Sequence, residues 1–208
     1  MKILILGAGG WGALVGAYLA SAGADVTLLF RRHLHVDEIE KNNGCLIIEK
    51  IDSEILVPVK ATVKPEEVTE IDLVIVAVKN HDSEKALRSI QHLHPKAVAS
   101  VQNGLGHEST LKKFFPKAEI LRIVSRVAGS LINYGRVRRG DADFPTWIGN
   151  PENGITPMVS QVSALFKDAG LPCEESGDIN SIEWCKIIWW TPSSISAVMS
   201  RLPQTEVM

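Results

Sequence analysis

Glycines near the amino terminus are spaced as in a phosphate-binding turn. The segment Gly7-Ala8-Gly9-Gly10-Trp11-Gly12 fits G-x-G-x-x-G and lies between two apolar runs, residues 2–6 and 11–22. In such a turn the first glycine permits the bend, the second lets the backbone approach a pyrophosphate, and the third lets the helix pack close to the sheet. Free N–H groups at the helix start favour phosphate charge. We therefore expect residues 7–12 to bind a dinucleotide, in preference to forming a purely structural turn.

Two arginines follow the second predicted strand, at the place where an NAD-specific site carries a carboxylate. Strand residues 25–30 lead directly into Arg31 and Arg32. A carboxylate would bind the ribose 2′-hydroxyl and repel a 2′-phosphate, whereas a guanidinium binds that phosphate with two hydrogen bonds. The sequence therefore favours NADPH, with Arg31 the better candidate and Arg32 the alternative. A solvated surface pair is the competing interpretation.

A lysine and an asparagine stand where two further strands end. Lys79 closes the apolar run 72–78, and Asn103 follows the run 97–101. In open α/β sheets the ligand crevice lies outside the carboxyl ends of the strands. Both side chains should therefore face that crevice, where the ammonium could hold an anion and the amide could bond a carbonyl or hydroxyl. A solvent-facing lysine and a plain Asn-Gly turn are equally good interpretations from position alone.

Strands alternating with helices must position these residues, which indicates an α/β, Rossmann-type, doubly wound and mostly parallel sheet. We expect strands over 2–6, 25–30, 72–78, 97–101 and 120–127, and helices over 11–22, 83–93, 108–115, 156–168 and 178–199. Two short β segments, 45–50 and 54–60, predict a hairpin or an edge insertion, and the turn-rich segment 133–146 predicts a β-ribbon.

Composition excludes several classes of protein. The chain has 208 residues, 45% of them hydrophobic, and a net charge of −2, which gives no electrostatic basis for nucleic-acid or membrane-surface binding. Its three cysteines include no CxxC pair, and no window reaches the roughly 20 apolar residues of a membrane span. No histidine or cysteine pattern completes a metal site. We expect a cytoplasmic protein without metal, nucleic-acid or membrane partners, and we expect Cys185 to be a small buried residue.

These motifs together resemble the ketopantoate reductase (2-dehydropantoate 2-reductase) family. The resemblance covers essentially the whole chain in order, and its most specific parts are QNGLG, residues 102–106, and the Trp-x-Lys motif within EWCKIIWW, residues 183–190. It implies NADPH-dependent reduction of 2-dehydropantoate to (R)-pantoate, on the route to coenzyme A. It also implies that Lys186 is the catalytic lysine, that Asn103 lies near substrate and nicotinamide, and that Lys79 lies at the crevice.

The chemistry of Lys186 is consistent with that role. Hydride transfer to a ketone leaves negative charge on oxygen, and a positioned ammonium stabilises that charge and delivers a proton, an effect of order 10²–10⁴-fold. Partial burial on an apolar helix would lower the lysine pKa and make it a better acid near neutrality. Without the resemblance, a lysine whose stem runs past apolar neighbours to water would be the preferred interpretation.

Two departures from the family pattern bear on substrate binding. Trp190 stands where the family usually has a substrate-binding asparagine, and Ser194 stands where a second one is common. Beyond a Rossmann domain over 1–176, residues 177–208 resemble only the first helix of the family's helical substrate and dimerisation domain. We expect nucleotide binding with poor or absent reductase activity, and a homo-oligomer, a dimer, to cover the apolar helix.

Three functions therefore remain open at this point. The first is a ketopantoate reductase. The second is a related 2-oxoacid or hydroxyacid dehydrogenase, which Trp190 favours by changing the shape and polarity of the pocket. The third is a non-catalytic NADP(H)-binding protein, which the shortened helical part favours.

Overall fold

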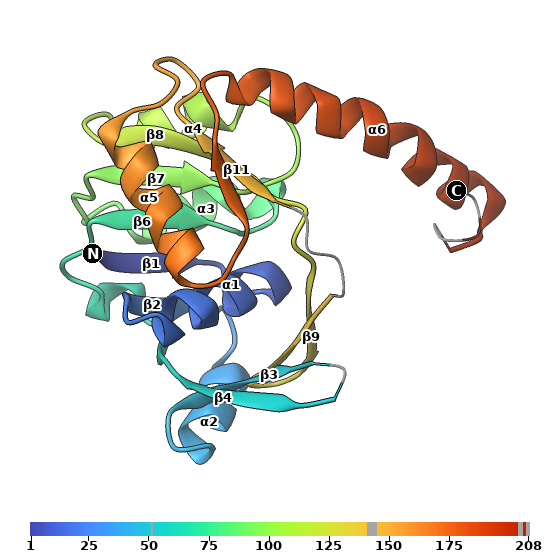
Figure 1. Cartoon of the computed structure of the whole chain (residues 1–208). Coiled ribbons are helices and arrows are strands. Elements are labelled where there is room, and N and C mark those ends of the chain that lie inside the picture. Colours follow the sequence, from blue (N-terminus) through green and yellow to red (C-terminus); the bar gives the residue numbers. More distant parts are fainter. Residues whose placement is uncertain (51, 141–144, 204–205, 207–208) are drawn as a thin grey trace.

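The computed structural model describes residues 1–50, 52–140, 145–203 and 206, and it is built on an eight-stranded sheet (Figure 1). The strand order is β12-β11-β8-β7-β6-β1-β2-β5, and every neighbouring pair is parallel except β8 and β11. The predicted mostly parallel sheet is thus confirmed. The strands are β1 (Lys2–Leu6), β2 (Asp25–Leu29), β5 (Lys60–Thr62), β6 (Leu73–Val76), β7 (Ala97–Ser100), β8 (Glu119–Val124), β11 (Thr146–Gly149) and β12 (Cys173–Glu175).

Helices cover both faces of this sheet, as the doubly wound prediction requires. Along β1, Ile3 and Ile5 belong to one buried cluster, with helices α1 and α5, while Leu4 and Leu6 belong to a second, with α3 and α4. Alternation of the side chains of one strand between two apolar layers explains why the run is apolar throughout. The helices are α1 (Gly10–Ser21), α2 (His33–Lys41), α3 (Ser83–Ser89), α4 (His107–Phe114), α5 (Pro157–Asp168) and α6 (Ile179–Ser200), with short 3-10 turns η1 (Pro65–Glu67) and η2 (Asn80–Asp82).

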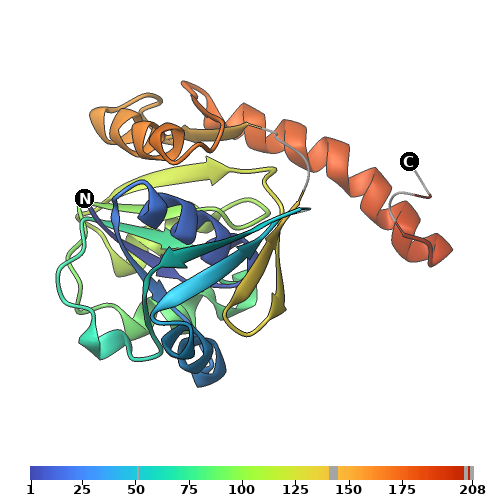
Figure 2. The same cartoon turned by 60° about the horizontal axis from the view of Figure 1, so that its bottom comes forward.

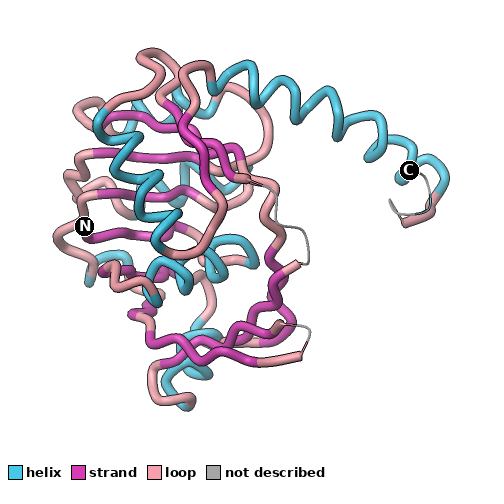
Figure 3. Tube along the Cα trace, viewed as in Figure 1, coloured by secondary structure: helices cyan, strands magenta, loops and turns pink. Residues whose placement is uncertain are grey.

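The side of β1 on which successive strands are added changes after β5. From β1 it proceeds to β2 and β5 on one side, and it then returns to β6 on the other side of β1. The strands run side by side through the centre of the molecule (Figure 3), so the segments that follow β1, β6 and β7 emerge at one edge. Such a switch point is where open α/β sheets bind ligands.

A second sheet of four strands packs over α1 (Figure 2). Its order is β4-β3-β10-β9, and its residues Leu46, Ile48 and Val137 are buried in the same cluster as Leu14 of α1. The predicted hairpin and β-ribbon are both present in it. Its strands are β3 (Cys45–Glu49), β4 (Glu54–Pro58), β9 (Gly129–Asn133) and β10 (Arg136–Arg139).

Several predicted boundaries are corrected by the structure. The expected strand 54–60 is divided after Pro58, because β5 leaves the hairpin and pairs with the edge of β2, where it shields that edge. The helix predicted over 83–93 ends at Ser89. The ribbon begins at Gly129 rather than at residue 133, and part of the predicted segment, 141–144, lies outside the described residues. Strands β11 and β12 were not predicted.

Helix α6 runs away from the rest of the molecule over much of its length (Figure 1). Its apolar side chains beyond the first turns are largely exposed, including Ile188 at 66%, Val198 at 78% and Met199 at 80%. The predicted domain division at residues 176 and 177 stays a prediction. Within the described ranges, no helix combines the length and apolarity needed to cross a membrane.

Candidate active site

The glycine turn between β1 and α1 leaves open space at one glycine and close packing at the others. Gly7 has φ +96°, and a Cβ added there would lie 2.5 Å from Val78 Cγ1. A Cβ on Gly12 would lie 2.5 Å from the Gly7 carbonyl oxygen, so this glycine lets α1 approach the turn. A Cβ on Gly9, in contrast, would meet no heavy atom within 4 Å. The backbone of Gly9 is therefore accessible from the crevice.

This arrangement fits a pyrophosphate. Gly9 is the N-cap of α1 and offers no side-chain hydrogen bond to the helix, so the first N–H groups keep their capacity to bind an anion. Gly7, Ala8 and Gly9 line a cleft of about 600 Å³ that extends over Phe30 to Arg31. The space falls within the range of small-ligand sites, and it is open to solvent.

Gly10 and Trp11 pack away from this cleft. A Cβ on Gly10 would lie 2.1 Å from the Gly129 carbonyl oxygen, which shows that the two backbones are in direct contact. The half-buried indole of Trp11 donates a hydrogen bond from Nε1 to Ser125 Oγ at 3.1 Å. The structure therefore places these two predicted cofactor-binding residues against β9 and Ser125.

Cations gather at the outer end of the cleft. Arg31, Arg32 and Lys79 all line it and are exposed. Arg31 is the most constrained of them, because its Nη1 lies 3.5 Å from Asp82 Oδ2. Lys85, on α3, lines the same cleft and was not singled out from the sequence. Four cationic side chains thus face one opening together with a single carboxylate, Asp82.

Lys186 and Asn103 meet at the same carboxyl edge of the sheet, beyond the residues that line this cleft. This is the inner end of the crevice at that edge, and the cleft is its outer end. The Lys186 amine donates hydrogen bonds to Asn103 Oδ1 and to the Ser125 main-chain oxygen, each at 2.8 Å. The two side chains come from positions 83 residues apart, yet they were both predicted site residues. Burial, the largest cause, and the positive charges of Arg122 and Arg126 together lower the pKa of Lys186 to about 8. The predicted shift in this lysine is thus present.

A buried arginine holds the surroundings of this pair. Arg122, on β8, has a side chain only 2% exposed and forms an ion pair with Glu183, three residues before Lys186 on α6. Its guanidinium also donates to Ser100 Oγ at 2.9 Å, to the Gly104 carbonyl oxygen at 3.0 Å and to the Gln102 carbonyl oxygen. Arg122 therefore ties the first turns of α6 to the loop that carries Asn103.

Gln102 extends this network to the neighbouring strand end. Its Nε2 donates to the Val78 carbonyl oxygen at 2.9 Å and to Ser83 Oγ at 2.6 Å. The amide therefore bridges the segment that bears Lys79 and the segment that bears Asn103. Sequence analysis missed Gln102, Arg122 and Glu183. The one available signal was a charged residue in the middle of the apolar strand EILRIV, since an unpaired charge is rarely buried.

Three residues of α6 differ from expectation or lie apart from the site. Ser194 is exposed, two turns beyond Lys186, or about 12 Å along the helix axis at 1.5 Å per residue. The structure does not bring it together with Lys186 and Asn103. Trp190 is half-buried, and its indole nitrogen finds no hydrogen-bond partner among the described residues. Cys185, expected to be buried, is exposed, because it lies with Trp184 on a part of α6 that faces solvent while its neighbour Lys186 contacts Asn103.

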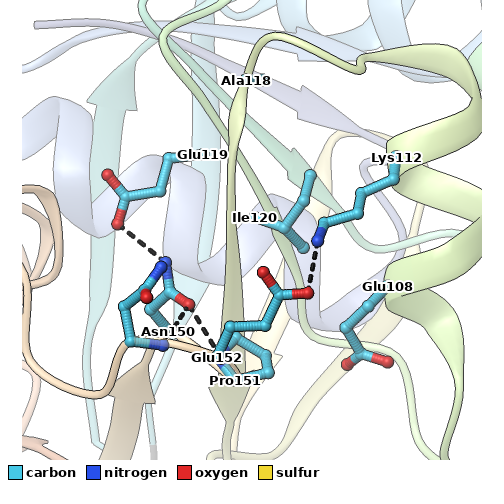
Figure 4. A pocket seen from close by; sticks show the side chains of 9 residues that line it. Glu108, Lys112, Ala118, Glu119, Ile120, Asn150, Pro151 and Glu152 are labelled. Carbon is cyan, nitrogen blue, oxygen red and sulfur yellow. Dashed lines mark hydrogen bonds and ion pairs between the residues drawn. The ribbon is translucent and has the colours of Figure 1, made fainter.

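A second cavity lies away from this crevice, between α4, the start of β8 and the turn at residues 150–153 (Figure 4). It measures about 230 Å³. Its polar groups are engaged with one another, as Lys112 pairs with Glu152 and Asn150 Nδ2 donates to Glu119 Oε1 at 3.1 Å. Over the described part of the chain, no cluster of three histidine, cysteine or carboxylate side chains could hold a metal ion.

The fold is similar to those of solved oxidoreductase structures. A PanE/ApbA family ketopantoate reductase from Ralstonia eutropha JMP134 superimposes with a TM-score of 0.79 at 32% identity, over 90% of this chain and 60% of that one. A D-mandelate dehydrogenase, solved as a ternary complex with NADH and anilino(oxo)acetate, superimposes with a TM-score of 0.74 at 26% identity, over 84% and 56%.

Sequence comparison agrees and identifies the family. A 2-dehydropantoate 2-reductase from Pyrococcus abyssi is 36% identical over 190 residues, which are 90% of this chain and 60% of the relative. The chain thus spans about 60% of the length of the curated relatives it matches first. The model of the family "Ketopantoate reductase PanE/ApbA" matches residues 3–153. The chain belongs to the ketopantoate reductase PanE/ApbA family.

Proposed function

We propose that this protein binds NADPH and serves the reduction of 2-dehydropantoate to (R)-pantoate. The observation that carries the proposal is the contact of Lys186 Nζ with Asn103 Oδ1, at the same sheet edge as the glycine turn. Bound NADPH would supply a hydride to the ketone carbon. The residues that would hold it are the backbone of Gly7–Gly9 for the pyrophosphate and Arg31 for the 2′-phosphate, with Lys79 at the crevice.

Lys186 is suited to act on the ketone oxygen. Its amine already donates two hydrogen bonds, and a substrate oxygen can replace one of these acceptors. Because the pKa is lowered to about 8, the ammonium form still dominates at neutral pH while its proton is more easily released than that of an ordinary lysine. Asn103 holds the amine in place and can bond the substrate hydroxyl or carbonyl through its amide.

A related 2-oxoacid dehydrogenase is the second candidate. Trp190, one turn beyond Lys186, places on the helix that carries the lysine an indole whose N–H has no hydrogen-bond partner within the described ranges. The likeness to a D-mandelate dehydrogenase solved with NADH and anilino(oxo)acetate also supports a different 2-oxoacid, and NADH as cofactor. A non-catalytic NADP(H)-binding protein is the third candidate.

Assembly and location belong to the same proposal. The exposed apolar side of α6, which includes Trp184 at 53% and Ile195 at 51%, supports a homodimer that covers it. A cytoplasmic location agrees with three cysteines that are all free within the structure.

Two matched glycine variants test the nucleotide site. Gly9→Ala introduces a methyl group into open space at φ −75°, so the fold should be unaffected while the affinity for NADPH falls about tenfold or more. Gly10→Ala should instead destabilise the fold by about 1–3 kcal/mol, because the methyl group meets the Gly129 backbone. Fluorescence titration with NADPH and urea unfolding measure the two effects. Unchanged NADPH affinity in a folded Gly9→Ala variant would remove the basis of the proposal.

Turnover separates the three candidates. NADPH oxidation by the purified chain with 2-dehydropantoate selects the first. Oxidation with another 2-oxoacid only, such as phenylglyoxylate, selects the second, and NADPH binding without turnover of either selects the third.

A further inference from the structure

A second cation lies beside Lys186 on the substrate side of the crevice. Arg126 follows Ser125, the residue whose main-chain oxygen accepts a hydrogen bond from Lys186 Nζ at 2.8 Å. On its other side, the Arg126 guanidinium carbon lies 4.8 Å from the centroid of the Trp189 ring. Trp189 is three residues beyond Lys186 on α6, and residues at that spacing are neighbours on a helix surface. These two contacts, together with the lowering of the Lys186 pKa by the charge of Arg126, place the guanidinium in the neighbourhood of the amine.

The contact with Trp189 prepares Arg126 to bind an anion. A guanidinium over an indole face is held by cation–π attraction, which limits its conformations. Its N–H groups lie in its own plane, so the contact with the ring below one face is compatible with hydrogen bonds donated from the edges of the fork. Both partners are accessible, since Arg126 is half-buried and Trp189 is 51% exposed. A small carboxylate can therefore reach this fork from solvent.

Two neighbouring cations suit the chemistry of a 2-oxoacid. In such a substrate the carboxylate is bonded directly to the carbon that accepts hydride. The group that binds the carboxylate must therefore lie beside the group that protonates the ketone oxygen. Of the two arginines whose charges depress the Lys186 pKa, Arg122 is buried against Glu183, which leaves Arg126 as the one at a half-exposed position.

We propose that Arg126, held by Trp189, binds the carboxylate of the 2-oxoacid substrate next to Lys186. The inference rests on the proposed function and assigns the substrate-recognising residue of that same site. Arg126 donates two hydrogen bonds to the carboxylate oxygens while Lys186 donates one to the ketone oxygen. The anion also relieves the repulsion between two neighbouring cations, so selectivity for carboxylates over uncharged ketones follows from this pair.

Binding of the product to four forms of the chain tests this assignment. Pantoate and the uncharged pantolactone are titrated into the chain saturated with NADP⁺, with heat of binding and tryptophan fluorescence as readouts. Arg126→Gln should weaken pantoate binding at least tenfold. Arg126→Lys keeps the charge and loses the planar guanidinium, so its affinity for pantoate should be intermediate between those of Arg126→Gln and the wild type. Arg138→Gln is the matched control, because Arg138 lies on β10 in an exposed pair with Glu49. Pantolactone binding should be the same in all four proteins.

Retained NADPH affinity shows that Arg126→Gln is folded. If that variant does not fold, Arg126→Lys and Trp189→Leu take its place, and both should weaken pantoate binding several-fold. Three results would overturn the assignment: pantoate binding to Arg126→Gln as tight as to wild type, equal binding of pantoate and pantolactone by wild type, or no pantoate binding by NADP⁺-loaded wild type. Failure of wild type to bind NADPH at all would count against the proposed function itself, so the two failures are distinguishable.

Discussion

The two ends of the crevice carry the same kinds of side chain in opposite environments. At the outer end, Arg31 has a side chain that is 78% exposed, and its nearest carboxylate, Asp82, is 3.5 Å away. At the inner end, Arg122 is 2% exposed and paired with Glu183, and Lys186 is half-buried with a pKa lowered to about 8. Burial, more than residue type, separates these two groups of cations.

This difference suits the two ends to different tasks. Exposed cations keep their charge, and the desolvation cost of binding a phosphate to them is small. The net binding free energy of such an exposed ion pair is also modest. A desolvated lysine has a proton that is easier to release, which a proton donor to a developing alkoxide requires. The Arg122–Glu183 pair is almost completely buried, and we infer that it is a positioning pair for Lys186 and for the loop of Asn103.

Breaking the buried pair should have the largest effect on the fold. Arg122→Met leaves Glu183 buried without its partner, and loss of one member of such a pair costs about 3–5 kcal/mol of unfolding free energy. The exposed pair of Arg138 with Glu49 is the control, and Arg138→Met should cost at most about 1 kcal/mol in the same urea titration. The double variant Arg122→Met/Glu183→Met should recover much of the loss. Equal effects of the two single variants would show that burial does not distinguish the two classes of pair.

Removing the inner lysine should affect chemistry rather than cofactor binding. If the chain turns over a 2-oxoacid, Lys186→Met should lower kcat by about 10²–10⁴-fold, the usual contribution of a positioned acid, with the NADPH dissociation constant nearly unchanged. Stopped-flow measurement of NADPH oxidation gives the first quantity and fluorescence titration gives the second. A variant that loses NADPH affinity but retains kcat would reverse the roles that we assign to the two ends.

At the outer end the expected effect is smaller and selective. Arg31→Met removes one charge-assisted contact with the 2′-phosphate, so NADPH affinity should fall about tenfold while NADH affinity stays within about twofold. Arg32→Met is the matched variant, because Arg32 lines the same cleft next in sequence. If Arg32→Met changes the NADPH to NADH ratio and Arg31→Met does not, the alternative assignment holds.

The contrast also explains what sequence alone could predict. The order of strands and helices followed from apolar runs that end at glycines, and the carboxyl-edge placement of Lys79 and Asn103 followed from parallel topology. The short strands β11 and β12 contain 4 and 3 residues, and they exist through pairing with distant chain segments, which no local pattern records. The division of residues 54–60 was missed for the same reason, since β5 is fixed by β2.

The inner end was harder to predict than the outer one. Arg31 is adjacent to the strand that positions it, so local sequence suffices. Lys186 and Asn103 are separated by 83 residues, and only the family resemblance paired them. Arg122 and Glu183 are 61 residues apart, and a charge within a predicted buried strand signals that a partner exists without saying which one. Sites that depend on burial are thus the least visible in sequence, because burial is a property of the folded chain.

The smallest predicted effect is a pH dependence that belongs to the inner end. Lys186 has a folded-state pKa of about 8 against an ordinary value of 10.5, so between these values the unfolded chain holds a proton that the folded chain has lost. Stability rises with pH wherever the unfolded state binds more protons, so wild type should gain stability relative to Lys186→Met as pH increases from 7.5 to about 9.5. Urea unfolding of both proteins across this interval gives the difference, with Lys167→Met on the exposed side of α5 as the control for general pH effects. A difference that stays flat or falls would mean that the amine is not desolvated in solution, and the contrast between the two ends would then reduce to geometry alone.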